Sequence, residues 1–191
     1  MEPGRLFSDP TAAPTPPRPA ARHLDPPNPL EALSRTHAGR GAPYAVVVGC
    51  IDPRVPVETV LGQGPGALCV VRSAGHVLDR AVLGSVELAV SDLKMSLVFV
   101  LGHDDCRAVA AAREAVRTGH RPPGARQFLV DQIAPAIAPG DSLDRATRNH
   151  IRRTVATLRR AEQLQEPLAA GRIDVVGGIY RLESGHIEML H

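Results

Sequence analysis

The 191-residue chain is poor in several features that mark particular protein classes. It has no tryptophan, aromatic residues make up 3% of it, and its three cysteines are an odd number. Three cysteines cannot all pair, so a disulfide framework is not expected. This number instead favours a role in metal binding or catalysis. The chain has 22 lysines and arginines and 20 aspartates and glutamates. This near balance lacks the clustered positive excess that is typical of nucleic-acid-binding proteins. No stretch approaches the roughly 18 apolar residues that a membrane span requires.

The first 43 residues differ in composition from the remainder. Ten of the eighteen prolines fall in residues 1–43, where large apolar side chains are few. Such a segment buries too little surface to offset its ordering entropy, so we predict that 1–43 is mostly disordered. The first ten residues show no apolar core of a secretory signal, and we expect a cytoplasmic protein. Residues 44–191 are long enough for a single domain.

The domain of residues 44–191 alternates apolar, β-branched runs with helical patterns. Each run is typical of a strand buried on both faces, as in a parallel sheet. The predicted strands are 44–50, 67–71, 96–101 and 172–180, and the predicted helices cover 82–93, 108–116 and 151–164. Alternation of this kind predicts an α/β fold, a mainly parallel sheet flanked by helices. Residues 186–190 follow a turn and alternate, which predicts a short antiparallel edge strand at the end of the chain.

Residues with metal-binding side chains follow two of these strands. Cys50 ends the first strand, while His103 and Cys106 follow the third. The carboxyl ends of parallel strands meet at one edge of a sheet, so these side chains could converge. Two cysteines and one histidine suit Zn²⁺, and a three-ligand set leaves a position for water, as in catalytic sites. Cys69 lies inside a predicted buried strand and is a poor fourth ligand.

An acidic and a basic residue accompany the first cysteine at alternate positions. Zinc lowers the pKa of its bound water from about 15.7 to near 7, and a nearby acceptor would orient the resulting nucleophile. Asp52 can be that acceptor. An isolated carboxylate is costly in a pocket, and Arg54 can pair with it through two hydrogen bonds. Alternate residues of an extended segment point to the same side, so Cys50, Asp52 and Arg54 form a coherent set.

The motifs Cys50-x-Asp52-x-Arg54 and His103-x-x-Cys106 together resemble the paired signature of β-class carbonic anhydrases. The likeness extends through residues 71–76, 82–87 and 178–185, and covers about residue 44 to the end. It implies reversible hydration of CO₂ to bicarbonate and a proton by attack of zinc-bound hydroxide. It also implies that Cys50, His103 and Cys106 hold Zn²⁺, that Asp52 and Arg54 are catalytic, and that the chain forms a homodimer or higher oligomer. In a closed form, Asp52 could become the fourth ligand.

Two positions depart from the family pattern. Pro53 stands where the family usually has serine, and Arg107 stands where it usually has glycine. Proline removes an N–H donor, and a long side chain at 107 could hold an anion or crowd the substrate. These departures leave two alternatives open: a related zinc hydrolase or lyase acting on CS₂, COS or a biosynthetic intermediate, and a zinc-binding pseudoenzyme.

The remaining polar residues near the motifs have simpler interpretations. Asp104 and Asp105 resemble acidic residues in the first turn of a helix, where they favour the helix dipole. His76 could line the mouth of the pocket. Four further histidines of this domain lie outside the motifs and are expected at the surface, namely His120, His150, His186 and His191.

Overall fold

The computed structural model describes residues 43–64 and 66–191. The predicted disordered segment lies almost wholly outside these residues. The described part forms one five-stranded sheet in the order β2-β1-β3-β4-β5. Its strands are β1 (Ala45–Cys50), β2 (Leu68–Ser73), β3 (Leu97–His103), β4 (Asp174–Tyr180) and β5 (Ile187–Leu190). The first four strands are parallel and β5 is antiparallel to β4, which confirms the predicted α/β fold.

Burial of the strands follows their place in the sheet. Every residue of β1 and β3 is buried, as expected of central strands covered on both faces. The second strand was predicted to be equally buried, and this is wrong: β2 is an edge strand, and most of its side chains are only half-buried. Cys69 therefore sits on a partly open edge. The composition of a strand does not tell an edge position from a central one.

The helices are α2 (Val57–Val60), α3 (Arg80–Ser91), α4 (Arg107–Thr118), α5 (Arg126–Ile133), α6 (Leu143–Arg159) and α7 (Glu162–Ala169), with short 3₁₀ turns at Ala74–His76 and Ala134–Ala136. The helix predicted over 151–164 is two helices. Ser142 caps α6 through a hydrogen bond from the Arg145 N–H, and the helix ends at Arg159. No described helix combines the length and apolarity needed to cross a bilayer.

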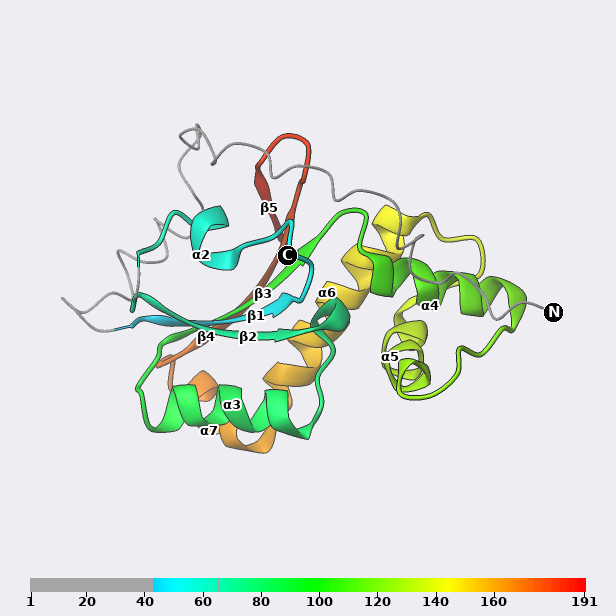
Figure 1. Cartoon of the computed structure of the whole chain (residues 1–191). Helices are drawn as coiled ribbons and strands as arrows, with labels where there is room; N and C mark the ends of the chain where they lie inside the picture. The colour runs from blue at the N-terminus through cyan, green and yellow to red at the C-terminus, as the bar shows by residue number, and fades with distance from the viewer. Residues whose placement is uncertain (1–42, 65) are drawn as a thin grey trace.

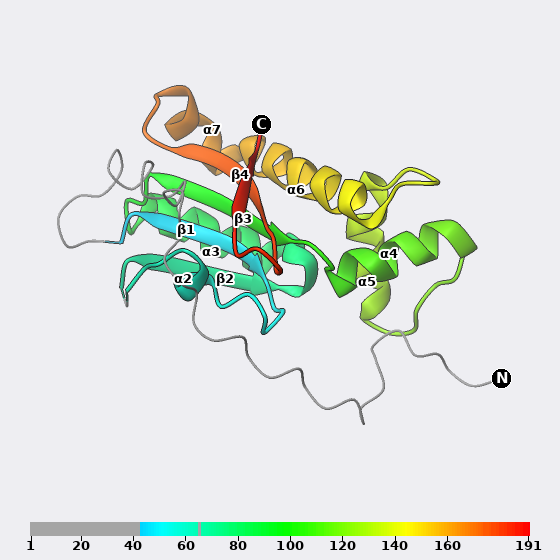
Figure 2. The same ribbon diagram turned by 90° about the horizontal axis from the view of Figure 1, so that it is seen from above.

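The sheet lies between unequal layers (Figures 1 and 2). Helices α3, α6 and α7 cover one face, where Val46, Val98 and Ile151 belong to the same apolar core. The short α2 packs on the other face, where Val47, Phe99 and Leu101 join a second core. Helices α4 and α5 lie beyond the carboxyl ends of β1 and β3, and a third core there includes Cys50 and Cys106. The two predicted motifs thus meet where α4 joins the sheet.

Gly102, next to His103 in β3, is required by the packing of α6. A Cβ atom there would lie 2.4 Å from Ile151 Cδ1 and 2.7 Å from its Cγ1. We predict that Gly102→Ala lowers the free energy of unfolding by about 1–3 kcal/mol, as overpacked cores do. Urea unfolding would measure this. Ile151→Val in the same chain should recover part of the loss, and purely additive effects of the two changes would contradict the predicted clash.

Candidate metal centre

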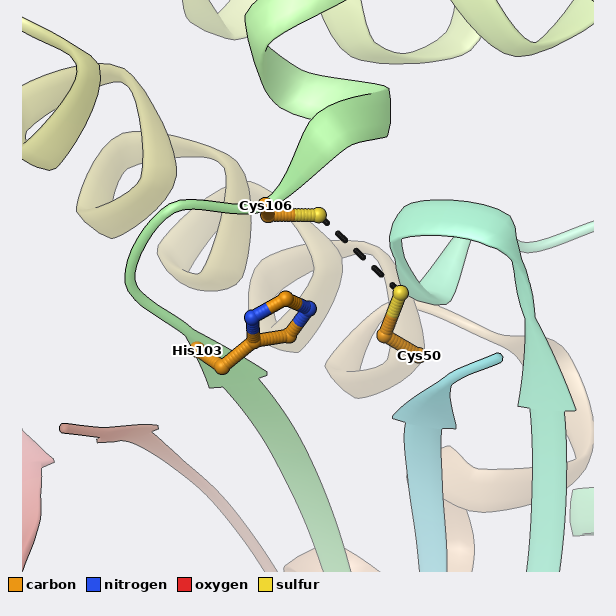
Figure 3. Close-up of side chains that lie close together, drawn as sticks. All are labelled: Cys50, His103 and Cys106. Atoms are coloured by element: carbon orange, nitrogen blue, oxygen red, sulfur yellow. Dashed lines mark hydrogen bonds between the residues drawn. The ribbon is translucent and has the colours of Figure 1, made fainter. Parts of the chain in front are cut away.

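Three side chains from two distant segments converge at the carboxyl edge of the sheet. One ligand atom from each of Cys50, His103 and Cys106 lies within 4.8 Å of the others. The two sulfurs are 4.0 Å apart, and the three side chains point toward one another (Figure 3). All three are buried, with exposed fractions of 4%, 0% and 1%. The predicted ligand set is therefore brought together by the fold.

The local backbone explains this convergence. Parallel pairing sets Gly49 beside Leu101, so β1 and β3 end together. After His103 the chain turns sharply at Asp105, whose φ is 51°, a conformation that aspartate tolerates better than most residues. This turn brings Cys106 back over the strand ends as the N-cap residue of α4.

The two nitrogens of His103 have different surroundings. Nδ1 lies 2.8 Å from the Asp104 carbonyl oxygen, which can only accept, so Nδ1 carries the proton of the neutral ring. Nε2 then presents a lone pair and, within the described residues, is buried without a hydrogen-bond partner. A carbonyl that fixes the tautomer in this way is the usual companion of a metal-binding histidine.

The thiols share their charge unevenly. A hydrogen bond from Cys106 lowers the pKa of Cys50 to about 4, against the effect of burial. The same bond, with burial, raises the pKa of Cys106 well above its usual range. Burial disfavours the charged form of His103, but the Cys50 sulfur, the Asp104 carbonyl and the Asp52 carboxylate together outweigh burial and raise the pKa of that imidazole. The cluster therefore carries protons that a metal ion would displace.

The donor set fits a zinc ion. Two sulfurs at about 2.3 Å from a tetrahedral Zn²⁺ are about 3.8 Å apart, close to the 4.0 Å between Cys50 and Cys106. The unpartnered Nε2 of His103 supplies a third, nitrogen donor. Within the described residues this is the one group of three or more histidine, cysteine or acidic side chains close enough to hold a metal ion.

Asp52 lies beside the cluster and is held by Arg54. The guanidinium Nε donates to Asp52 Oδ1 at 3.0 Å and its Nη2 donates to Oδ2 at 2.8 Å. Burial opposes ionisation of Asp52, but the hydrogen bonds from the Arg54 side chain and backbone N–H prevail and lower its pKa. Asp52 Oδ2 lies 3.9 Å from His103 Nε2. An ionised carboxylate thus borders the position that the three donor atoms surround.

Neither departure from the family pattern disturbs this arrangement. The Val55 N–H donates to the Asp52 carbonyl at 3.1 Å, so residues 52–55 form a turn with Pro53 at its second position. Proline is favoured there because its φ is preset and its missing N–H is not needed. Arg107 is exposed as the first residue of α4.

The helix-dipole interpretation of the two aspartates is wrong, since α4 begins after them at Arg107. Asp105 instead accepts a hydrogen bond from Arg54 Nη1 at 3.0 Å, and Asp104 accepts one from the Leu182 N–H at 3.0 Å. These two hydrogen bonds connect the segment between His103 and Cys106 to the turn at residues 52–55 and to the residues that follow β4. The sequence signal was present in their acidic character, but their partners are distant in the chain.

The prediction of surface histidines is confirmed for three residues and wrong for one. His120, His186 and His191 are exposed, whereas His150 is 3% exposed. His150 lies on the face of α6 that packs against the 3₁₀ turn Ala74–His76, where its ring stacks on that of His76. His76 is fully buried, so it does not line an open pocket mouth. A signal for its burial was present in the sequence, because His150 stands four residues from Ala146 and from Thr154, which are buried on the same face of α6.

Burial of His150 predicts a loss of stability in acid. Burial lowers its pKa from 6.5 to about 4, so the folded chain binds fewer protons than the unfolded chain between these values. Titration of His150 therefore leaves the free energy of unfolding unchanged above pH 6.5. Between pH 6.5 and pH 4 it lowers that free energy by up to about 1.4 kcal/mol for each pH unit. Burial also lowers the pKa of His76, and Arg153 opposes protonation of His150.

Urea unfolding between pH 4.5 and 7.5, at saturating zinc, would measure this dependence. In the His150→Gln variant, the free energy of unfolding should depend less steeply on pH, by about the contribution of one proton. The other groups titrate in both proteins and do not affect this difference. Equal slopes for the two proteins would contradict the assignment.

The mainly parallel sheet carries two thiols, an imidazole and an arginine-held carboxylate at its carboxyl edge. This combination is typical of a metal-dependent α/β enzyme. The family model for carbonic anhydrase matches residues 45–187. A carbonic anhydrase of Mycolicibacterium smegmatis is 43% identical over 162 residues, 82% of this chain and 78% of that protein. Carbonic anhydrase 2 of Mycobacterium tuberculosis is 44% identical over 149 residues, 75% of this chain and 72% of the relative.

Solved structures agree with the sequence relatives. The β-carbonic anhydrase CafA of Aspergillus fumigatus aligns with a TM-score of 0.68 at 25% identity, over 84% of this chain and 81% of that one. One of two tetrameric β-carbonic anhydrases of Sordaria macrospora aligns with a TM-score of 0.71 at 23% identity, over 84% and 86% of the two chains. The chain belongs to the β-class carbonic anhydrase family.

Proposed function

We propose that this chain catalyses the reversible hydration of CO₂ to bicarbonate and a proton, with Zn²⁺ held by Cys50, His103 and Cys106. The observation that carries the proposal is the convergence of their ligand atoms within 4.8 Å. Membership of the family supports the reaction, and the relatives of M. smegmatis and M. tuberculosis bear the name carbonic anhydrase. The sulfur–sulfur distance and the free lone pair on His103 support zinc.

Each residue has a role that follows from its contacts. When bound, zinc would supply a water of lowered pKa, and hence a nucleophile at neutral pH. The ionised Asp52 carboxylate lies 3.9 Å from His103 Nε2. It would accept a hydrogen bond from that nucleophile and orient the attacking oxygen toward CO₂. Arg54 occupies both carboxylate oxygens, which favours an open site over one in which Asp52 is a ligand. Asp105 in turn holds Arg54.

Two measurements on one sample test the proposal. Elemental analysis of the purified protein should find about one zinc per chain, and stopped-flow CO₂ hydration by that sample should exceed the buffer rate. Stoichiometric zinc without turnover would favour the pseudoenzyme alternative, and turnover of CS₂ or COS but not CO₂ would favour the related lyase. The exposed position of Arg107 gives no support to that second reaction.

We also propose that the chain forms a homodimer or a higher homo-oligomer. Leu68, Cys69, Val70 and Val71 of β2 are only half-buried, and among the described residues no further strand pairs with the outer side of β2. Open apolar edges of this kind are usually covered in stable proteins. The S. macrospora structures are of tetrameric enzymes. Sedimentation equilibrium at micromolar concentration should give at least twice the 20.3 kDa chain mass, and a monomer would contradict the proposal.

A further inference from the structure

We infer that His150 is a positioning residue for the metal centre, holding the Gly75 N–H against the sulfur of Cys50. His150 belongs to α6, a helix that contributes none of the three clustered side chains. The inference rests on the proposed zinc site, and it assigns a role to a buried histidine that the reaction itself does not use.

Two hydrogen bonds link the helix to the sulfur. His150 Nε2 lies 2.9 Å from the Gly75 carbonyl oxygen, and since a carbonyl only accepts, Nε2 is the donor. On its other side, the Gly75 N–H donates to Cys50 Sγ at 3.3 Å. Gly75 thus receives a bond from α6 and gives one to a metal-binding thiol.

The 3₁₀ turn Ala74–His76, which joins α6 to the Cys50 sulfur through these hydrogen bonds, has an unfavourable backbone conformation. Gly75 has φ 64° and His76 has φ 47°, two consecutive left-handed residues of which the second is not glycine. Such a conformation is unfavourable for an L-residue and persists where the surroundings impose it. A Cβ at Gly75 would lie 2.9 Å from Ala108 Cβ, so no other residue fits against α4.

His150 provides the constraint in two ways. Its N–H binds the Gly75 carbonyl, and its ring lies against that of His76, with centroids 4.5 Å apart and planes inclined by 30°. Both rings are almost completely buried. Removal of the Nε2 donor leaves the buried Gly75 carbonyl unpaired, and the turn then relaxes toward ordinary backbone angles. The Gly75 N–H would move away from Cys50.

An N–H donor at a thiolate ligand stabilises its negative charge and tunes its bond to the metal. Loss of such an outer partner usually lowers metal affinity by about 10- to 100-fold. His150 would therefore influence zinc affinity and the electronic state of Cys50 without touching the ion. A histidine that only fills space on α6 would influence neither.

Three variants of the full chain separate these roles. His150→Phe keeps a ring but cannot donate, whereas His150→Gln places an amide nitrogen where Nε2 lies. Thr147→Val is the matched control, because it removes a buried hydroxyl bonded to the Leu143 carbonyl on the same helix. The zinc dissociation constant, from competition with a chelator, and the sulfur-to-cobalt charge-transfer absorption of the Co²⁺-loaded protein are measured for each.

His150→Phe should bind zinc about 10- to 100-fold more weakly than the parent chain, with a shifted charge-transfer band. His150→Gln should restore both properties, and Thr147→Val should change neither while lowering the melting temperature. If His150→Phe does not fold, His150→Asn, whose amide is too short to reach Gly75, should show the same loss. Parent affinity and an unshifted band in either non-donating variant would overturn the inference alone. A parent chain that binds no zinc would overturn the proposed function as well.

Discussion

Asp52→Asn is expected to lower kcat/KM for CO₂ hydration by about 10²- to 10⁴-fold while zinc content stays unchanged. The side chain is 9% exposed and borders the three donor atoms, with Oδ2 3.9 Å from His103 Nε2. Asparagine keeps the volume but loses the charge that Arg54 holds and presents an N–H in place of one acceptor. Stopped-flow assays and elemental analysis of the same preparation would measure the two quantities.

The matched control for this change is Asp105→Asn. Asp105 also accepts a hydrogen bond from Arg54, but its side chain is 70% exposed and does not border the cluster. We expect a change of less than about threefold, as for most exposed ion pairs. Equal losses in both variants would show that the charge around Arg54, rather than the placement of the Asp52 carboxylate, is what matters.

Cys106→Ala is expected to lower zinc affinity by more than about 100-fold and to reduce CO₂ hydration to the buffer rate. This loss exceeds that for an outer-sphere partner because Cys106 would bind the metal directly. The thiol caps α4 by position only and makes no capping hydrogen bond, so the helix should survive the change. Chelator competition and circular dichroism would test both statements.

Cys69→Ala is the control for the loss of a thiol. Cys69 is the third free cysteine, half-buried on the edge strand β2 and outside the cluster. This variant should keep zinc and activity at the level of the parent chain. A Cys106→Ala protein that still purifies with stoichiometric zinc would mean that the ion, if present, is held elsewhere.

The sequence predicted the class of fold because its strongest signals are local. The continuous Val-rich run of β1 and the Leu-Val-Phe-Val run of β3 match buried parallel strands, and the alternation of 186–190 matches the antiparallel β5. The candidate site followed from ligand-type residues at the ends of predicted strands and from the resemblance of their motifs to a known family, and the parallel pairing of β1 with β3 brings those ends together.

What the sequence did not predict depends on contacts between distant segments. The apolar stripe over 151–164 continues across the break after Arg159, because Leu164 of α7 and Ile151 of α6 enter the same core from different helices. The edge position of β2 is set by strand order. The spacing of His150 from Ala146 and Thr154 indicated the buried face of α6, but its partner, the turn at Gly75, is distant in the chain.

X-ray absorption at the zinc K-edge of the purified protein would identify the atoms that bind the metal ion. We expect two sulfur ligands at about 2.3 Å, one imidazole nitrogen at about 2.0–2.1 Å and one further light-atom ligand. The Cys106→Ala protein, reloaded with zinc, should lose one sulfur from this set. A spectrum of the parent protein with only nitrogen and oxygen ligands, or with a single sulfur, would contradict the assignment of Cys50 and Cys106 to one metal ion.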